Sequence, residues 1–169
     1  MRNNNDEHTA QPFLRIKQAP SAKAEMLIRK PVEEVFEAFV NPAITAKFWF
    51  TKGSDRLQVG KQIRWDWEMY GHSVQVNVKE IEKNKRIVIE WSLYKTTLVE
   101  WQFTSLAIDE TFVSVTNTGF IGDGDEIIEQ ALSSTEGFTI MLAGAKAFLE
   151  HNIILNLVVD RFPDKVNNH

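Results

Sequence analysis

From residue 63 to residue 118 apolar and polar residues alternate, which is the period of β-strands with one buried face. Four of the five tryptophans, Trp65, Trp67, Trp91 and Trp101, occupy apolar positions of this pattern. The polar positions between them are rich in charged residues and amides. A chain with this pattern is expected to form an antiparallel meander with indole rings on one face and water on the other.

Turn residues predict how these strands pair. Tyr70-Gly71, as a two-residue hairpin loop, predicts the pairs Trp67–Val74, Trp65–Val76 and Ile63–Val78. Lys83-Asn84, as the next two-residue loop, predicts the pairs Val78–Ile89 and Val76–Trp91. Trp91 and Trp101 can share a face only if the loop near Tyr94 has an odd number of residues, and we expect it to have one. A last strand is predicted over 111–118.

Helical spacing flanks the meander. A strand over 23–28 is followed by a predicted helix from Val32 that stops near Asn41-Pro42, and by a short helix over 43–48. After residue 124, apolar residues recur every three or four positions from Ile127 to Leu149, with Leu132 in the stripe. We expect this long helix to cover the apolar face of the sheet, and the segment 153–159 to pack back on the body.

Length and composition predict one domain, because 169 residues with 43% apolar content suit a single core. We expect a flexible N-terminal arm over 1–22, a domain over 23–162 and a tail over 163–169. The net charge of −4 argues against nucleic acid as a partner, and the absence of cysteine excludes disulfides and thiolate metal sites. No apolar run is long enough to span a membrane and no signal peptide is recognisable, so we expect a cytoplasmic protein without membrane contact.

Catalytic and metal motifs are missing from the sequence. The four histidines lack metal-ligand spacing, and neither a nucleophile elbow nor a phosphate-binding glycine loop is found, so we predict no metal, no cofactor and no catalytic residue. His72 has two readings. It could pair with Glu68 or Asp66 as a general acid–base group, or it could be a solvated hairpin histidine, which the outward register of Glu68 favours.

The concentration of tryptophans on one face also has two readings. The rings could simply fill a core, or sheet and helix could stand apart and enclose an apolar cleft of a few hundred cubic ångströms, the ordinary volume of a small-molecule site. Gly137 and Gly144 indicate close approach of a ligand or of a neighbouring strand to the long helix.

Several stretches, taken in order, carry a resemblance to a known family. They are Ile28–Pro42, Lys47–Phe50, Gly60–Met69, Arg86–Trp91, Thr116–Phe120 and Gly137–Glu150. Between about residues 24 and 160 the chain resembles the START-like (SRPBCC, helix-grip) superfamily. Within it, the chain is similar to the activator of heat-shock-protein 90 ATPase homologues, a branch also described as polyketide-cyclase-like.

The resemblance implies an α+β helix-grip fold: a curved antiparallel sheet wrapped around a long C-terminal helix, with two short helices and a cavity between. Ligand-binding residues implied or expected at the cavity wall are Trp49, Trp65, Trp67, Trp91, Trp101, Phe120, Phe138, Met141 and Leu142. Phe138 stands where relatives commonly carry tryptophan, which changes the cavity shape. Asn3-Asn-Asn lacks the tryptophans of the segment associated with chaperone activation in the eukaryotic co-chaperone.

Three functions follow as hypotheses. The leading one is non-catalytic binding of a small hydrophobic or aromatic molecule between sheet and C-terminal helix. The second is an aromatase/cyclase-like enzyme acting on a polyketone, which requires an ionisable group inside the cavity. The third is a co-chaperone-like module that modulates a chaperone ATPase in a stress response. The chain is expected to be a monomer or a homodimer.

Overall fold

An antiparallel sheet accounts for the alternating part of the sequence. The computed structural model describes residues 16–93 and 95–163, and within them the sheet has seven strands in the order β1-β7-β6-β5-β4-β3-β2. The strands are β1 Ala22–Ile28, β2 Lys52–Gly53, β3 Gln62–Trp67, β4 His72–Glu82, β5 Arg86–Ser92, β6 Thr96–Ala107 and β7 Glu110–Thr118. The helices are α1 Val32–Val40, α2 Pro42–Thr45, the 3-10 turn η1 Glu68–Tyr70, α3 Gly124–His151 and α4 Leu157–Arg161.

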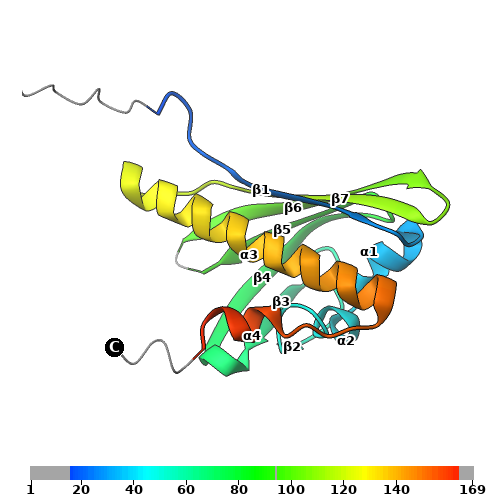
Figure 1. The fold of residues 1–169 in the computed structure, drawn as a ribbon. Helices are drawn as coiled ribbons and strands as arrows, with labels where there is room; N and C mark the ends of the chain where they lie inside the picture. Colours follow the sequence, from blue (N-terminus) through cyan, green and yellow to red (C-terminus); the bar gives the residue numbers. More distant parts are fainter. Residues whose placement is uncertain (1–15, 94, 164–169) are drawn as a thin grey trace, which may run out of the picture.

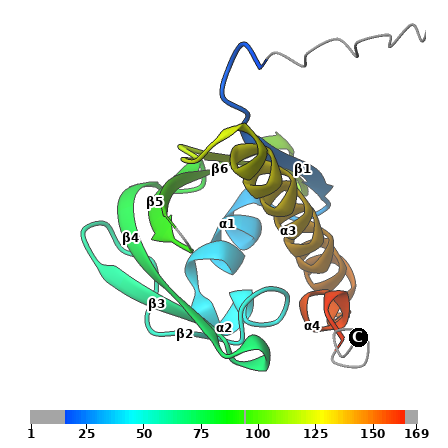
Figure 2. The ribbon, with the colours of Figure 1, turned by 90° about the vertical axis from the view of Figure 1, so that its left-hand side faces the viewer.

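The sheet curls around α1, and α3 closes the open side (Figures 1 and 2). Helix α3 packs chiefly along β1, the strand at one edge of the sheet. The apolar faces of sheet, α1 and α3 meet in one continuous core. This arrangement confirms the predicted α+β helix-grip fold.

The first hairpin differs in register from the prediction. The observed pairs are Trp67↔His72, Trp65↔Val74 and Ile63↔Val76, each displaced by two residues from the expected partner. The cause is η1, which makes the turn four residues long and ends at Gly71 with a left-handed φ of 60°. A shift of two preserves the side on which each residue lies, so Trp65 and Trp67 still face the core.

At the next turn the predicted pairs are observed, but the predicted two-residue loop Lys83-Asn84 is wrong. Val76↔Trp91 and Val78↔Ile89 pair as expected, and a bulge between Val78 and Glu80 then changes the register toward a three-residue turn at 83–85. Ser92 pairs with Thr96, so the third loop has the odd length that brings Trp91 and Trp101 to one face.

The helices confirm the predicted pattern with local corrections. Helix α1 ends at Val40, next to the predicted stop at Asn41-Pro42, whereas α2 is shorter than expected because residues 46–48 form turns. Helix α3 begins with a capping box between Asp123 and Glu126. Leu132, predicted on the buried stripe, is 67% exposed. The buried side of the helix instead contains Ala131 and Phe138.

Two further expectations are met only in part. A Cβ at Gly144 would lie 3.1 Å from the carbonyl oxygen of Phe48, so α3 approaches the segment after α2, whereas nothing lies close to Gly137. In the segment 153–159 only Val158 packs against the core, where the Tyr70 hydroxyl donates to its carbonyl, and residues 153–155 are exposed. Most of the predicted arm and the tail after residue 163 lie outside the described residues.

Candidate functional site

Trp49 is the centre of an aromatic cluster. Its ring centroid lies 4.9 Å from that of Trp65, 5.7 Å from Trp67, and 6.0 Å from both Trp91 and Trp101. Phe138 of α3 approaches from the other side at 6.1 Å. Most of these contacts are tilted or edge-to-face, which are favourable geometries for aromatic pairs. The single tryptophan outside the sheet therefore fills the space between the sheet and α3.

The space that remains is small. A narrow gap lies between the side chains of Phe39, Trp49, Leu57, Trp65, Ile87 and Trp101, and it has no room for a water molecule. We expected a cleft of a few hundred cubic ångströms under α3. The observed gap is smaller because Trp49 occupies the space beneath Phe138, and it lies beside α1 rather than against α3.

The walls of this gap differ in how firmly they are held. Trp65, Ile87 and Trp101 belong to β3, β5 and β6, and Ile87 pairs directly with Trp101. Trp49 and Leu57 lie in irregular segments after α2 and β2. The Trp49 N–H donates to the Thr45 carbonyl, and the Leu57 N–H donates to the Val40 carbonyl. Because these segments are outside the sheet ladder, they can shift at lower cost than the strands.

The predicted ligand-binding residues are all in the described structure, but few of them line the gap. Trp49, Trp65 and Trp101 do. Trp67, Trp91, Phe138, Met141 and Leu142 are buried in the surrounding core, and Phe120 is half-buried. Ile87 and Phe39 also line the gap. Leu57 was missed, because a single leucine in a polar loop carries no periodic signal.

The end of the core near Trp91 contains a polar network. The Trp91 Nε1–H donates to Thr97 Oγ1 at 2.9 Å, and Asn117 Nδ2 donates to the same oxygen at 2.9 Å. Asn117 Nδ2 also donates to the Leu98 carbonyl, and the Ser134 hydroxyl donates to Asn117 Oδ1. The network thus joins β5, β6 and β7 to α3.

Trp101 has no such partner. Its side chain is 2% exposed, and its Nε1–H is the buried side-chain polar atom that finds no hydrogen-bond partner among the described residues. The indole N–H can only donate, and the residues around the gap present apolar side chains. Trp91 and Trp101, two of the four buried indoles on this sheet face, therefore differ in polar environment.

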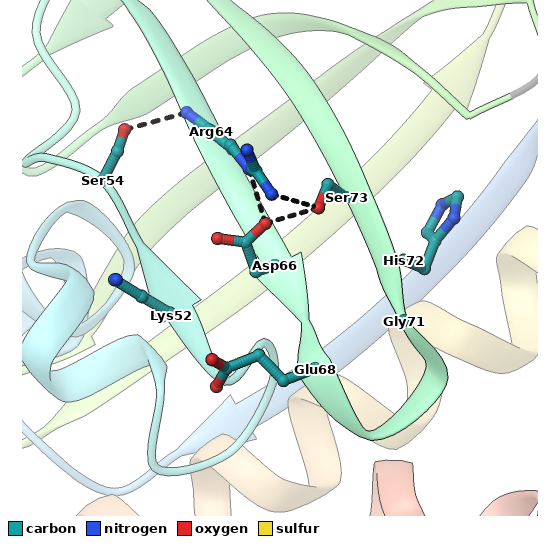
Figure 3. Close-up of a pocket in the computed structure, with 8 residues that line it drawn as sticks. All are labelled: Lys52, Ser54, Arg64, Asp66, Glu68, Gly71, His72 and Ser73. Atoms are coloured by element: carbon teal, nitrogen blue, oxygen red, sulfur yellow. Dashed lines mark hydrogen bonds and ion pairs between the residues drawn. The ribbon is translucent and has the colours of Figure 1, made fainter.

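A larger hollow of about 570 Å³ lies on the outer face of the sheet near β2–β4 (Figure 3). Its lining residues are Lys52, Ser54, Arg64, Asp66, Glu68, Gly71, His72 and Ser73. Arg64 Nε donates to Asp66 Oδ1 at 2.7 Å, and the Ser73 hydroxyl donates to the same oxygen at 2.5 Å. The hydrogen bond from Ser73, followed by that from Arg64, lowers the pKa of Asp66. Arg64, Asp66 and Ser73 are therefore hydrogen-bonded to one another in the open groove.

His72 does not join this outer cluster. Figure 3 shows its ring directed away from Asp66 and Ser73, and its ring centroid lies 6.4 Å from that of Trp67. The acid–base pair with Asp66 or Glu68 is therefore not formed. Within residues 16–93 and 95–163, no group of three or more His, Cys, Asp or Glu side chains could hold a metal ion. Across the same part of the chain, no helix has the length and apolar character needed to cross a membrane.

Comparison with known proteins places this geometry in context. Residues 29–150 match the family model described as Activator of Hsp90 ATPase homolog 1-like protein. No curated protein matches the chain.

Solved structures share the fold. The protein SSP2350 from Staphylococcus saprophyticus is 30% identical, with a TM-score of 0.69, covering 80% of this chain and 96% of that one. The Aha1 dimer from Colwellia psychrerythraea is 18% identical, with a TM-score of 0.65, covering 78% and 97%. CalU16 from Micromonospora echinospora is 15% identical, with a TM-score of 0.64, covering 82% and 79%. At the lower identities the likeness concerns the fold alone.

Proposed function

Because the chain belongs to the family of Activator of Hsp90 ATPase homolog 1-like proteins, a family with the helix-grip fold, we propose that it binds a small, uncharged aromatic or apolar molecule among the rings of its core. The site is the gap between β3, β5 and β6 on one side and Phe39, Trp49 and Leu57 on the other. The ligand enters by displacing Trp49 and Leu57. No covalent chemistry is required.

The observation that carries this proposal is the difference in secondary structure between the two walls of the gap. Trp65, Ile87 and Trp101 form a fixed apolar surface within the hydrogen-bonded sheet. Trp49 and Leu57 close the gap from irregular segments, each 7–8% exposed. A site with one rigid wall and one displaceable wall can admit a ligand without unfolding the sheet.

The expected affinity follows from the area that such a ligand buries. Burial yields about 0.8 kcal/mol per CH₂ group, so a six-carbon ring gains about 5 kcal/mol. That gain corresponds to a Kd of roughly 0.2 mM before the cost of moving Trp49 and Leu57. Small probes must therefore be tested up to millimolar concentration, and a larger natural ligand is expected to bind more tightly.

The cyclase-like alternative lacks a catalytic group in this interior. The buried polar residues of the described chain are Thr45, Thr97, Thr111 and Asn117. None of these side chains titrates near neutral pH, so none can exchange a proton as a general acid or base. For the chaperone alternative, the family name and the Aha1 dimer from Colwellia are similarities of sequence and fold, and no described surface favours a chaperone as partner.

Leu57 offers a test in two directions. Leu57→Ala enlarges the gap and is expected to bind toluene about fivefold more tightly than the natural chain, while losing about 2–3 kcal/mol of stability. Leu57→Phe fills the gap and is expected to weaken toluene binding by a similar factor. Binding is measured by titration of tryptophan emission, and stability by urea denaturation.

Val59→Phe is the matched control, because Val59 lies in the same loop but is 55% exposed. This variant is expected to bind toluene like the natural chain. Absence of binding by the natural chain and by Leu57→Ala, up to the solubility limit of toluene, would refute the proposal. Equal effects of Leu57→Phe and Val59→Phe would place the ligand elsewhere.

A further inference from the structure

The Trp101 indole N–H is an unused donor beside the proposed site. The ring is 2% exposed, it lines the gap, and its Nε1 has no partner among the described residues. Buried polar groups in folded proteins are almost always hydrogen-bonded, so an exception requires an explanation. The gap beside the ring is too small for a water molecule, so a water could satisfy this donor only if the walls moved.

Neighbouring rings do not replace the missing acceptor. Trp49 and Phe138 stand at 63° and 84° to the Trp101 ring, with centroids at 6.0 Å and 6.1 Å. A ring face is at most a weak acceptor compared with a carbonyl oxygen. Phe39 and Ile87 offer only hydrocarbon. The Trp101 N–H therefore has no good hydrogen-bond acceptor while the gap is closed.

The indole N–H of Trp91, unlike that of Trp101, has a hydrogen-bond acceptor within the fold. Trp91 and Trp101 lie on adjacent strands with their rings in the same core. Thr97, directly opposite Trp91 in the register, accepts its N–H. The residue opposite Trp101 on β5 is Ile87, and on β7 it is Val115, neither of which has a side-chain acceptor. The absence of an acceptor is thus local to the gap.

From this contrast, and resting on the proposed function, we propose that Trp101 Nε1 is the polar contact of the site and selects neutral aromatic or apolar ligands that carry a hydrogen-bond acceptor, such as a ketone or ester oxygen. A ligand donor finds no side-chain acceptor among the gap residues and loses its hydrogen bond to water. A carboxylate is excluded because no described cation lines the gap to compensate its burial.

Two probes of nearly equal shape test the assignment. Acetophenone has a C=O group where α-methylstyrene has C=CH₂, so the pair differs mainly in the acceptor. Affinities of both probes are measured by NMR titration of the natural chain, Trp101→Phe and Trp91→Phe. The affinity ratio of acetophenone to α-methylstyrene cancels solvation differences of the free ligands when it is compared between variants.

The ratio is expected to fall about tenfold in Trp101→Phe, because the ligand oxygen is then buried without a donor. It is expected to change less than twofold in Trp91→Phe, which keeps the Trp101 donor. Binding of both probes with an unchanged ratio in Trp101→Phe would overturn the role of Trp101 and leave the proposed function intact. Failure of the natural chain to bind either probe would overturn both.

A second measurement follows binding to the natural chain and uses Trp101→Phe only to assign a resonance. The indole N–H resonance that disappears in Trp101→Phe identifies Trp101 in the spectrum of the ¹⁵N-labelled natural chain. Acetophenone is expected to move this proton downfield more than α-methylstyrene does, while the Trp91 resonance moves little with either probe. Equal shifts from the two probes would contradict a hydrogen bond to the ligand.

Discussion

The two ends of the core differ in whether a buried tryptophan N–H is hydrogen-bonded. At one end the Trp91 N–H is bonded to Thr97, which belongs to a network that reaches Asn117 and Ser134 and ties three strands to α3. At the other end the Trp101 N–H has no partner among the described residues, and the ring lines the gap together with apolar side chains. A satisfied buried network holds elements in a unique arrangement, whereas an unsatisfied donor retains free energy that a ligand can recover.

The difference extends to the backbone around each indole. The hydrogen-bonded partners of Trp91 lie on strands and on a capped helix. Two walls at the Trp101 end come from irregular segments. Under the proposed function, the Trp91 end serves stability and the Trp101 end serves binding. Substitutions at the two ends should therefore separate the two properties.

The largest effect on stability is expected from Asn117→Ala. This change removes the hydrogen bonds to Thr97, Leu98 and Ser134 from a residue that is 2% exposed. The loss in free energy of unfolding is expected to be about 3 kcal/mol, measured by urea denaturation. Asn77→Ala, on the exposed face of β4, is the control and should cost less than about 0.5 kcal/mol.

Toluene affinity is the second readout for Asn117→Ala. It should stay within about twofold of the natural value, because the network does not line the gap. A large loss of affinity in a folded Asn117→Ala protein would show that the two ends are coupled and would break the comparison.

A smaller effect is expected when the two indoles receive the same substitution. Trp91→Phe loses a hydrogen bond as well as ring volume, whereas Trp101→Phe loses volume and an unsatisfied donor. Trp91→Phe should therefore be less stable than Trp101→Phe by about 1 kcal/mol. Thermal and urea unfolding of both variants measure the difference. Equal stability would mean that the Trp101 N–H has an acceptor as good as Thr97.

An effect of similar size is expected at Glu150, which belongs to neither end. Lys146 Nζ and the Arg29 N–H donate to its carboxylate, clamping α3 to the end of β1. Burial acts to raise the pKa of Glu150, but these hydrogen bonds outweigh it and hold the pKa below 4.5. The resulting stability is present above the ordinary pKa and is lost as the pH falls through the lowered one.

Glu150→Gln is accordingly expected to cost about 1 kcal/mol at neutral pH, with the difference from the natural chain shrinking in acid. Urea denaturation at a series of pH values measures it, with the exposed Glu129→Gln as control. A constant difference across the acid range would show that the carboxylate charge is not involved. Toluene binding should not change.

Much of the fold could be predicted because successive residues of a strand point to opposite faces of the sheet. Alternation gave the buried face of each strand, and this face survived the two-residue shift of the first hairpin, since Trp65 is buried opposite Val74 as it would be opposite Val76. The shift itself was not predictable, because η1 depends on turn geometry that Tyr70-Gly71 alone does not specify.

The candidate site was less accessible to prediction. The sequence indicates that Trp49 is apolar, but not that its ring turns into the space beneath Phe138 and reduces the expected cleft to a gap. Leu57 reaches the gap through a loop without periodicity. The unpartnered N–H of Trp101 follows from the identity of cross-strand neighbours and from ring packing, which only the three-dimensional structure defines.

A crystal structure of the protein with acetophenone tests the central claim most directly. We expect the ketone oxygen within hydrogen-bond distance of Trp101 Nε1, with Trp49 and Leu57 displaced and with Trp65, Ile87 and Trp101 unmoved. Acetophenone bound only in the polar groove of β2–β4, or in the core without contact to Trp101 Nε1, would contradict it.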